Sequence, residues 1–203
     1  MLVTDRRLVG GADALVSVVD EAVAGGATAV QLREKDLPPG ELLSLARRLR
    51  EVTAGRACLI VNGPLEVALA CKADGVHLPD VAAMLERPAE ALLVGRSVHS
   101  LEAARRAELE RADYLIAGPL WKAASHPDST PAGLQLIESI SATVAVPVLA
   151  IGGVSAIRVQ RAINAGAVGV AAVSAFVLDT AQETAKMRGA LDDAWAIKAR
   201  RAR

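Results

Sequence analysis

Short apolar runs alternate with longer amphipathic stretches along the whole chain. Eight runs are rich in aliphatic and β-branched residues, as buried strands are; they cover residues 2–4, 29–33, 57–61, 75–78, 92–97, 113–117, 146–151 and 168–173. Eight segments with helical spacing of their apolar positions lie near residues 13–24, 40–53, 64–71, 80–87, 100–111, 133–143, 155–165 and 175–198. Strands that alternate with helices predict parallel pairing through right-handed crossovers. The pattern therefore predicts an α/β protein.

The number of strand–helix pairs favours one closed architecture. Eight pairs in 203 residues fit a single (β/α)8 TIM barrel near the lower end of its size range. A doubly wound open sheet is the competing fold, but it usually has fewer strands and opens with a glycine-rich loop, which does not follow the first strand here. Because no linker-like tract divides the chain, we expect one domain over residues 1–203, with 198–203 as a frayed basic tail.

Composition narrows the range of partners. The chain has 23 Lys and Arg against 23 Asp and Glu, so its formal net charge is zero. This balance argues against nucleic acid and against acidic membrane surfaces as partners. No apolar run approaches the roughly 18 residues that span a bilayer, and the first residues do not resemble a signal peptide. We expect a cytoplasmic protein that binds neither nucleic acid nor membranes.

The second predicted strand carries charge where an active site would lie. In a (β/α)8 barrel the site lies at the carboxyl ends of the strands. Side chains alternate between faces along a strand, so Gln31, Arg33 and Lys35 share the face toward the barrel mouth. Two inward cations are costly without an anionic partner. The pattern predicts a clamp for phosphate or carboxylate, and the alternative is an internal salt bridge to Asp5 or Glu34.

The last two predicted strands end in small residues. Gly152 and Gly153 follow the seventh strand; Val173 ends the eighth, and Ser174 follows it. Backbone N–H groups at these two positions form the usual phosphate site of this fold. The sequence therefore predicts a phosphate site between the two loops.

A long connection, residues 118–132, follows the sixth strand and contains His126. Its turn-rich composition is typical of a lid or binding loop. Histidine titrates near neutral pH, so His126 is a candidate for proton transfer to a substrate. His77 and His99 also lie near strand ends, where a structural role as hydrogen-bonded rim residues is the simpler interpretation. The spacing of the three histidines does not suit a metal site.

Several motifs in this order resemble the thiamine phosphate synthase superfamily, small (β/α)8 enzymes of thiamine biosynthesis. The resemblance covers nearly the whole chain and rests on Leu2-Val3-Thr4-Asp5, Gln31-Leu32-Arg33-Glu34-Lys35, Asn62, Ala73-Asp74-Gly75-Val76-His77-Leu78, Ser97-Val98-His99-Ser100, Ala112-Asp113-Tyr114, Gly118-Pro119, Gly133-Leu134, Ala150-Ile151-Gly152-Gly153 and Gly169-Val170-Ala171. It implies a small-molecule thiazole phosphate as ligand and a homodimer as assembly.

The superfamily has two branches, which differ in their use of metal. Synthases join a pyrimidine methyl diphosphate to a thiazole phosphate, need Mg²⁺, and carry Asn-Asp and His-Leu-Gly-Gln-x-Asp patterns. TenI-like thiazole tautomerases isomerise a carboxythiazole phosphate to its aromatic form without a metal. Here Gly63 follows Asn62, and Ala82 stands where the second metal carboxylate is expected. Since Mg²⁺ is held mainly by carboxylates and substrate phosphates, we expect a metal-independent tautomerase, an isomerase with neither metal nor cofactor.

The tautomerase hypothesis assigns roles to individual residues. His126, in the long loop, would move the proton, and Arg33 and Lys35 would act with it on the substrate. The substrate would be bound by Gln31, Asn62, Ser97, His99, Gly152, Gly153, Val173 and Ser174.

One position departs from the tautomerase pattern, because Pro119 stands where that branch has its acid–base histidine. Two alternatives therefore stay open. The first is an Mg²⁺-dependent thiamine phosphate synthase whose metal site is rebuilt around Asp80. The second is a non-catalytic protein that binds thiazole phosphate or thiamine phosphate.

Overall fold

Eight parallel strands form one sheet in which each strand pairs with the next along the chain. The computed structural model describes residues 1–81, 92–122, 130–176 and 179–201. The strands are β1 (Leu2–Val3), β2 (Ala29–Leu32), β3 (Cys58–Val61), β4 (Gly75–Leu78), β5 (Leu93–Val98), β6 (Tyr114–Ala117), β7 (Val148–Ala150) and β8 (Gly169–Val170). This sequential order excludes the doubly wound alternative, in which the strand order reverses at a switch point. The prediction of eight parallel strands is confirmed.

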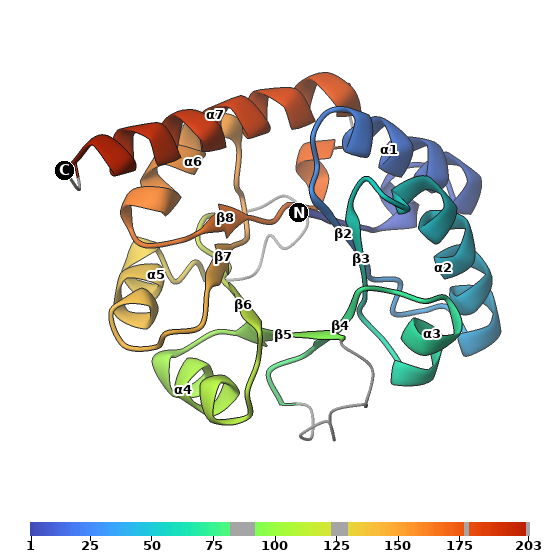
Figure 1. The fold of residues 1–203 in the computed structure, drawn as a ribbon, viewed down its shortest axis with the longest axis horizontal. Helices are drawn as coiled ribbons and strands as arrows, with labels where there is room; N and C mark the ends of the chain where they lie inside the picture. The colour runs from blue at the N-terminus through green and yellow to red at the C-terminus, as the bar shows by residue number, and fades with distance from the viewer. Residues whose placement is uncertain (82–91, 123–129, 177–178, 202–203) are drawn as a thin grey trace.

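The sheet curls around a common centre with the helices on its outside (Figure 1). The segment that follows β8 returns to β1. Leu2 forms a parallel bridge with Ala172, and the Val3 N–H donates to the Ala172 carbonyl at 2.9 Å. The carboxyl ends of the first and last strands are therefore neighbours.

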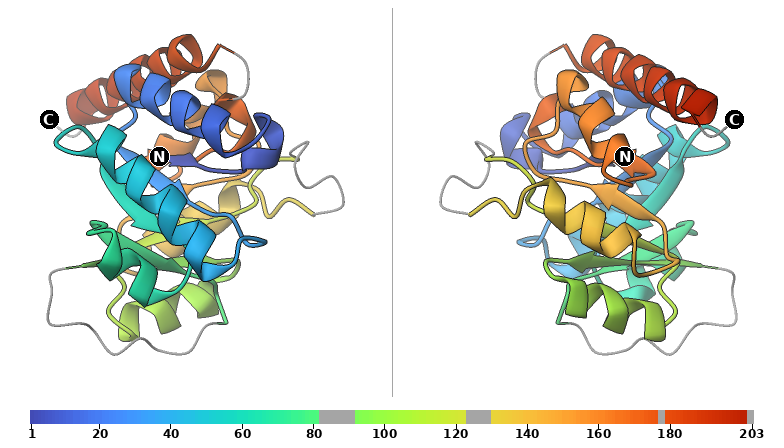
Figure 2. Two further views of the ribbon diagram at one scale, coloured as in Figure 1. Left: turned by 90° about the vertical axis from the view of Figure 1, so that its right-hand side faces the viewer. Right: turned by 90° about the vertical axis from the view of Figure 1, so that its left-hand side faces the viewer.

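The helices follow the strands as the apolar spacing predicts. They are η1 (Arg6–Leu8), α1 (Ala12–Ala24), α2 (Pro39–Thr53), α3 (Leu65–Ala70), α4 (Leu101–Leu109), α5 (Leu134–Ser141), α6 (Ala156–Asn164), η2 (Ser174–Phe176) and α7 (Thr180–Arg201). The helix expected near residues 80–87 falls largely outside the described residues. Helix α7 lies beside α1 and α6 (Figure 2) and continues through Arg201. Within the described ranges no helix is long and apolar enough to cross a membrane.

Two apolar clusters lie on opposite faces of the strands. The outer cluster packs strand residues such as Val30 and Leu32 against the helices, and the inner one joins Val3, Ile116 and Ala171. Because side chains alternate along a strand, Gln31 faces the interior between these outward residues. The inner apolar cluster therefore lies beneath polar side chains at the carboxyl ends of the strands.

Candidate functional site

A cavity of about 460 Å³ opens at the carboxyl ends of the strands. Its lining includes every predicted substrate-binding residue, together with the two predicted catalytic cations: Gln31, Arg33, Lys35, Asn62, Ser97, His99, Gly152, Gly153, Val173 and Ser174. The fold thus brings together residues from several different strand ends. His126, the predicted proton carrier, lies outside the described residues.

Two cations line the cavity without an acidic partner. Among the residues that the structure describes, Arg33 and Lys35 form no salt bridge. The predicted alternative, an internal salt bridge to Asp5 or Glu34, is therefore wrong. The two positive charges are left available to an anionic ligand.

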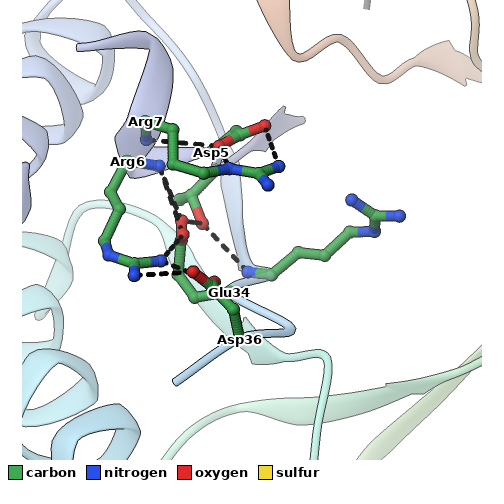
Figure 3. Close-up of polar contacts among 7 residues, drawn as sticks. Asp5, Arg6, Arg7, Glu34 and Asp36 are labelled. Atoms are coloured by element: carbon green, nitrogen blue, oxygen red, sulfur yellow. Dashed lines mark hydrogen bonds and ion pairs between the residues drawn. The ribbon is translucent and has the colours of Figure 1, made fainter. Parts of the chain in front are cut away.

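The acids beside this strand already have partners from the loop after β1 (Figure 3). Glu34 is buried and accepts hydrogen bonds from the Thr4 hydroxyl at 2.7 Å and the Arg6 N–H at 3.0 Å. The Arg6 guanidinium binds both carboxylate oxygens of Asp36, at 2.7 and 2.8 Å, and lowers the pKa of Asp36 to about 2. Arg7 binds Asp5 in the same bidentate way and lowers its pKa. Because these acids are already paired with Arg6 and Arg7, they form no salt bridge with Arg33 or Lys35.

Backbone N–H groups line a second region of the cavity. In the described part of the chain, the N–H groups of Gly153, Val173 and Ser174 donate no hydrogen bond. Gly153 has φ = 64°, a conformation that suits glycine and disfavours other residues. Unpaired N–H groups at a cavity wall are suitable donors to phosphate oxygens.

Two groups of hydrogen-bonded polar side chains lie at the floor of the cavity. The Asn62 amide donates to Gln31 Oε1 at 3.3 Å, and the Gln31 amide nitrogen donates to Met1 Sδ at 3.9 Å. The Tyr114 hydroxyl lies 3.2 Å from His77 Nδ1, and His77 Nε2 lies 2.9 Å from Ser97 Oγ. Apart from Met1, these side chains come from β2 to β6 or directly after them.

Burial determines the charge states of His77 and Tyr114. Desolvation, with the nearby positive charges of Arg33 and Arg96, lowers the pKa of His77 to about 3. Burial also raises the pKa of Tyr114 well above its usual value. Both side chains are therefore neutral at physiological pH, and the His77 ring has one donor and one acceptor nitrogen.

The loops after β6 and β7 are bound to each other along one side of the cavity. The Leu120 and Trp121 N–H groups donate to the carbonyls of Ile151 and Gly152, both at 3.0 Å. His99 Nδ1 donates to the Gly118 carbonyl, because a carbonyl oxygen can only accept. His99 is thus held as a rim residue, as the simpler interpretation of the sequence proposed.

The donor set does not fit the Mg²⁺ ion that the synthase branch implies. Asp80 carries the only carboxylate among the described lining residues, and it forms a salt bridge with Arg106. No group of three or more His, Cys, Asp or Glu side chains in the described ranges could hold a metal ion. A rebuilt metal site around Asp80 is therefore not supported.

Sequence reasoning missed the link between Tyr114 and His77. Tyr114 is the only tyrosine in the chain, and it precedes the inward Ile116 by two residues. Gly95, between the two rings in the sheet, was the signal that could have revealed their contact. Both His77 and Tyr114 pair with Gly95 in the strand register.

The sequence is similar to those of known proteins. Residues 1–176 match the sequence profile described as thiamine monophosphate synthase. The chain belongs to this family. A thiamine-phosphate synthase of Methanoculleus marisnigri is 43% identical over 184 residues, covering 88% of this chain and 87% of the relative. A thiamine-phosphate synthase of Moorella thermoacetica is 41% identical over 177 residues, covering 83% of each chain.

A solved structure in the family agrees with these relatives. Thiamine phosphate pyrophosphorylase from Pyrococcus furiosus superposes with a TM-score of 0.83 at 34% identity, covering 95% of each chain. These similarities contradict the predicted tautomerase. That prediction gave most weight to two missing carboxylates, whereas relatives similar over most of the chain are named as synthases. Loss of metal ligands at two positions did not identify the branch.

Proposed function

We propose that this protein is a thiamine-phosphate synthase, which joins a pyrimidine methyl diphosphate to a thiazole phosphate and releases diphosphate. The observation that carries the proposal is one cavity with two sets of groups that can bind anions. Arg33 and Lys35 form the first, and the free N–H groups of Gly153, Val173 and Ser174 form the second. Two phosphorylated substrates that must meet in one cavity would require two such regions.

The two regions would have different tasks in the reaction. The backbone donors would hold the thiazole phosphate, which does not react. The cations would neutralise the diphosphate, which leaves with the electron pair of the broken C–O bond. The thiazole nitrogen would supply the pair for the new C–N bond to the methylene carbon. Arg33 and Lys35 would thus act most strongly as charge develops on the leaving group.

The closure of the sheet, the oligomeric state and the size of the substrates belong to the same proposal. We propose that the sheet is a closed (β/α)8 barrel of one domain, supported by the hydrogen bonds between β1 and Ala172. The assembly would be the homodimer implied by the family resemblance, which light scattering would test. The substrates would be small molecules.

The test is to mix the two substrates with the protein and Mg²⁺ and to measure thiamine phosphate. We expect product from the wild type. Arg33→Ala and Lys35→Ala should each lower kcat/KM by about 10- to 100-fold, the range for losing a hydrogen bond to a charged group. Arg48→Ala is the control, since Arg48 pairs with Asp13 on the outer helices. No product from the wild type would refute the proposal.

A further inference from the structure

Three consecutive N–H groups of the loop after β7 lie at the cavity. Gly152, Gly153 and Val154 line it, and in the described part of the chain their N–H groups donate no hydrogen bond. Gly152 has φ = 92° and Gly153 has φ = 64°, both in the left-handed region. Backbone of this kind can turn successive N–H groups toward one anion. The loop therefore offers more donors to an anion than the Gly153 N–H alone.

The carbonyls of the same peptide units are bonded on the other side of the loop. The carbonyls of Ile151 and Gly152 accept from backbone N–H groups of the loop after β6. The Gly153 carbonyl accepts instead from the Arg158 guanidinium, which comes from the first turn of α6. Arg158 is not among the described residues that line the cavity, so it bonds the loop from behind.

The geometry of the peptide unit converts this bond into a direction for the next N–H group. The unit that joins Gly153 to Val154 is trans. The carbonyl and the N–H of a trans unit point in opposite directions. Because the carbonyl is bonded to Arg158, the Val154 N–H points away from Arg158, on the side of the cavity that Val154 lines.

A second contact fixes the Arg158 side chain. Its Cζ atom lies 5.3 Å from the centroid of the Trp121 ring, within the range of a cation–π contact. Trp121 is itself bonded to the loop after β7, because its N–H donates to the Gly152 carbonyl at 3.0 Å. Among the described residues Arg158 forms no salt bridge. The two contacts thus hold its positive charge directly behind the three N–H groups.

We propose that Arg158 is a positioning residue that prepares this loop to bind the thiazole phosphate. It fixes the Val154 N–H as a further donor and, by polarising the peptide unit, makes that N–H a stronger one. Its charge also favours an anion on the other side of the unit. The identity of the ligand rests on the proposed function, whereas binding of phosphate by the loop does not.

Inorganic phosphate is the probe for the ligand-free protein. The chain has two tryptophans, so Trp195→Phe leaves Trp121, which is bonded to the loop, as the only one. We expect phosphate to change the Trp121 fluorescence along a saturable curve, which gives a dissociation constant. The absence of a saturable change would overturn the proposal, whatever reaction the protein catalyses.

The next comparison sets Arg158 against a matched charge on the same helix. In the Trp195→Phe background, Arg158→Ala should raise the dissociation constant about five- to tenfold, as expected for one lost hydrogen bond. Arg161→Ala is the control, since Arg161 is exposed one turn further along α6 and its side chain bonds to no described residue. It should change the constant by less than about twofold, because solvent and salt screen an exposed charge. Equal effects of the two variants would refute positioning by Arg158.

Two further replacements separate the hydrogen bond from packing. Arg158→Lys keeps a charged donor, and Arg158→Met keeps an unbranched stem without one. Arg158→Lys should regain part of the affinity that Arg158→Ala loses, whereas Arg158→Met should bind phosphate no better than Arg158→Ala. Thermal unfolding verifies that each variant is folded. If Arg158→Met binds phosphate as tightly as the unsubstituted protein, the side chain only packs, and the proposal is wrong.

The reaction provides a separate readout. Arg158→Ala should raise the KM for thiazole phosphate about five- to tenfold, while kcat and the KM for the pyrimidine methyl diphosphate stay near their wild-type values. The reason is that the thiazole phosphate group is bound but not altered in the reaction. A lower kcat with both KM values unchanged would contradict this role. A wild type that forms no thiamine phosphate would refute the proposed function instead, and the phosphate titrations would still decide the role of Arg158.

Discussion

His77 is a buried ionisable residue whose charge state should be measurable in protein stability. Its pKa falls from an ordinary 6.5 to about 3, mainly through burial and further through Arg33 and Arg96. Between these two values the unfolded chain binds a proton that the folded chain does not. Stability should therefore be lost as the pH falls below 6.5, with a slope of up to about 1.4 kcal/mol per pH unit from this one group.

The measurement is urea denaturation of the wild type and of His77→Gln between pH 6.5 and pH 4.5. The difference between the two slopes isolates His77, because the carboxylates are common to both proteins. We expect the wild type to lose stability faster with acidification. Equal slopes would mean that the folded protein accepts a proton at His77.

The sequence pattern predicted which side chains face the cavity, but it did not predict the contacts between them. The alternation of side chains along β2 was enough to predict that Gln31, Arg33 and Lys35 face the cavity, since a strand has a period of two. The contact between Tyr114 and His77 depends on two strand registers and on the space at Gly95. Neither register follows from the sequence of one strand alone.

At the scale of elements, the loop after β7 depends on a close approach to the loop after β6. Gly153 has φ = 64°, and a Cβ there would lie 2.7 Å from the Lys122 carbonyl oxygen and 2.9 Å from Trp121 Cβ. Gly153→Ala should lower stability by about 1–3 kcal/mol, the cost of a strained backbone position. It should also weaken binding of thiazole phosphate, because the loop that carries the N–H donors must move.

Gly55→Ala is the matched control, since Gly55 has φ = 69° and no atom within 4 Å of its Cβ position. It should show the backbone strain alone and leave thiazole phosphate affinity unchanged. Thermal unfolding and calorimetry of both variants provide the comparison. If the two variants lose equal stability and both bind normally, the loops do not position the phosphate.

Element boundaries were predicted well where the apolar period ends abruptly. Residues 75–78 were predicted as a strand and form β4 with those same bounds. The last helix was expected near residue 175, but α7 begins at Thr180 after the short η2. Apolar periodicity does not separate a 3-10 turn from the first turn of an α-helix, so the position of the segment after β8 relative to α7 could not be predicted.

At the scale of the whole molecule, the net charge is zero, but the positive and negative side chains are not evenly mixed. Asp5 and Glu34 are paired with Arg7 and Arg6, whereas Arg33 and Lys35 line the cavity and form no salt bridge with a described residue. Composition argued against polyanionic partners for the chain as a whole, and it could not reveal a positive cavity. Similarity along most of the chain likewise favours the synthase branch, against the interpretation that a few positions suggested.

This distribution of charge leads to a prediction about metal binding. A cavity with two free cations and one acid, Asp80, already paired with Arg106, should repel a divalent cation. We expect no heat of binding when MgCl₂ alone is titrated into the ligand-free protein. Arg106→Ala releases the carboxylate and should permit only weak binding, which Asp80→Asn in the same background should abolish. If the wild type binds Mg²⁺ and Asp80→Asn abolishes that binding, the prediction is wrong. The Asp80 carboxylate would then be available to the metal in spite of its salt bridge with Arg106.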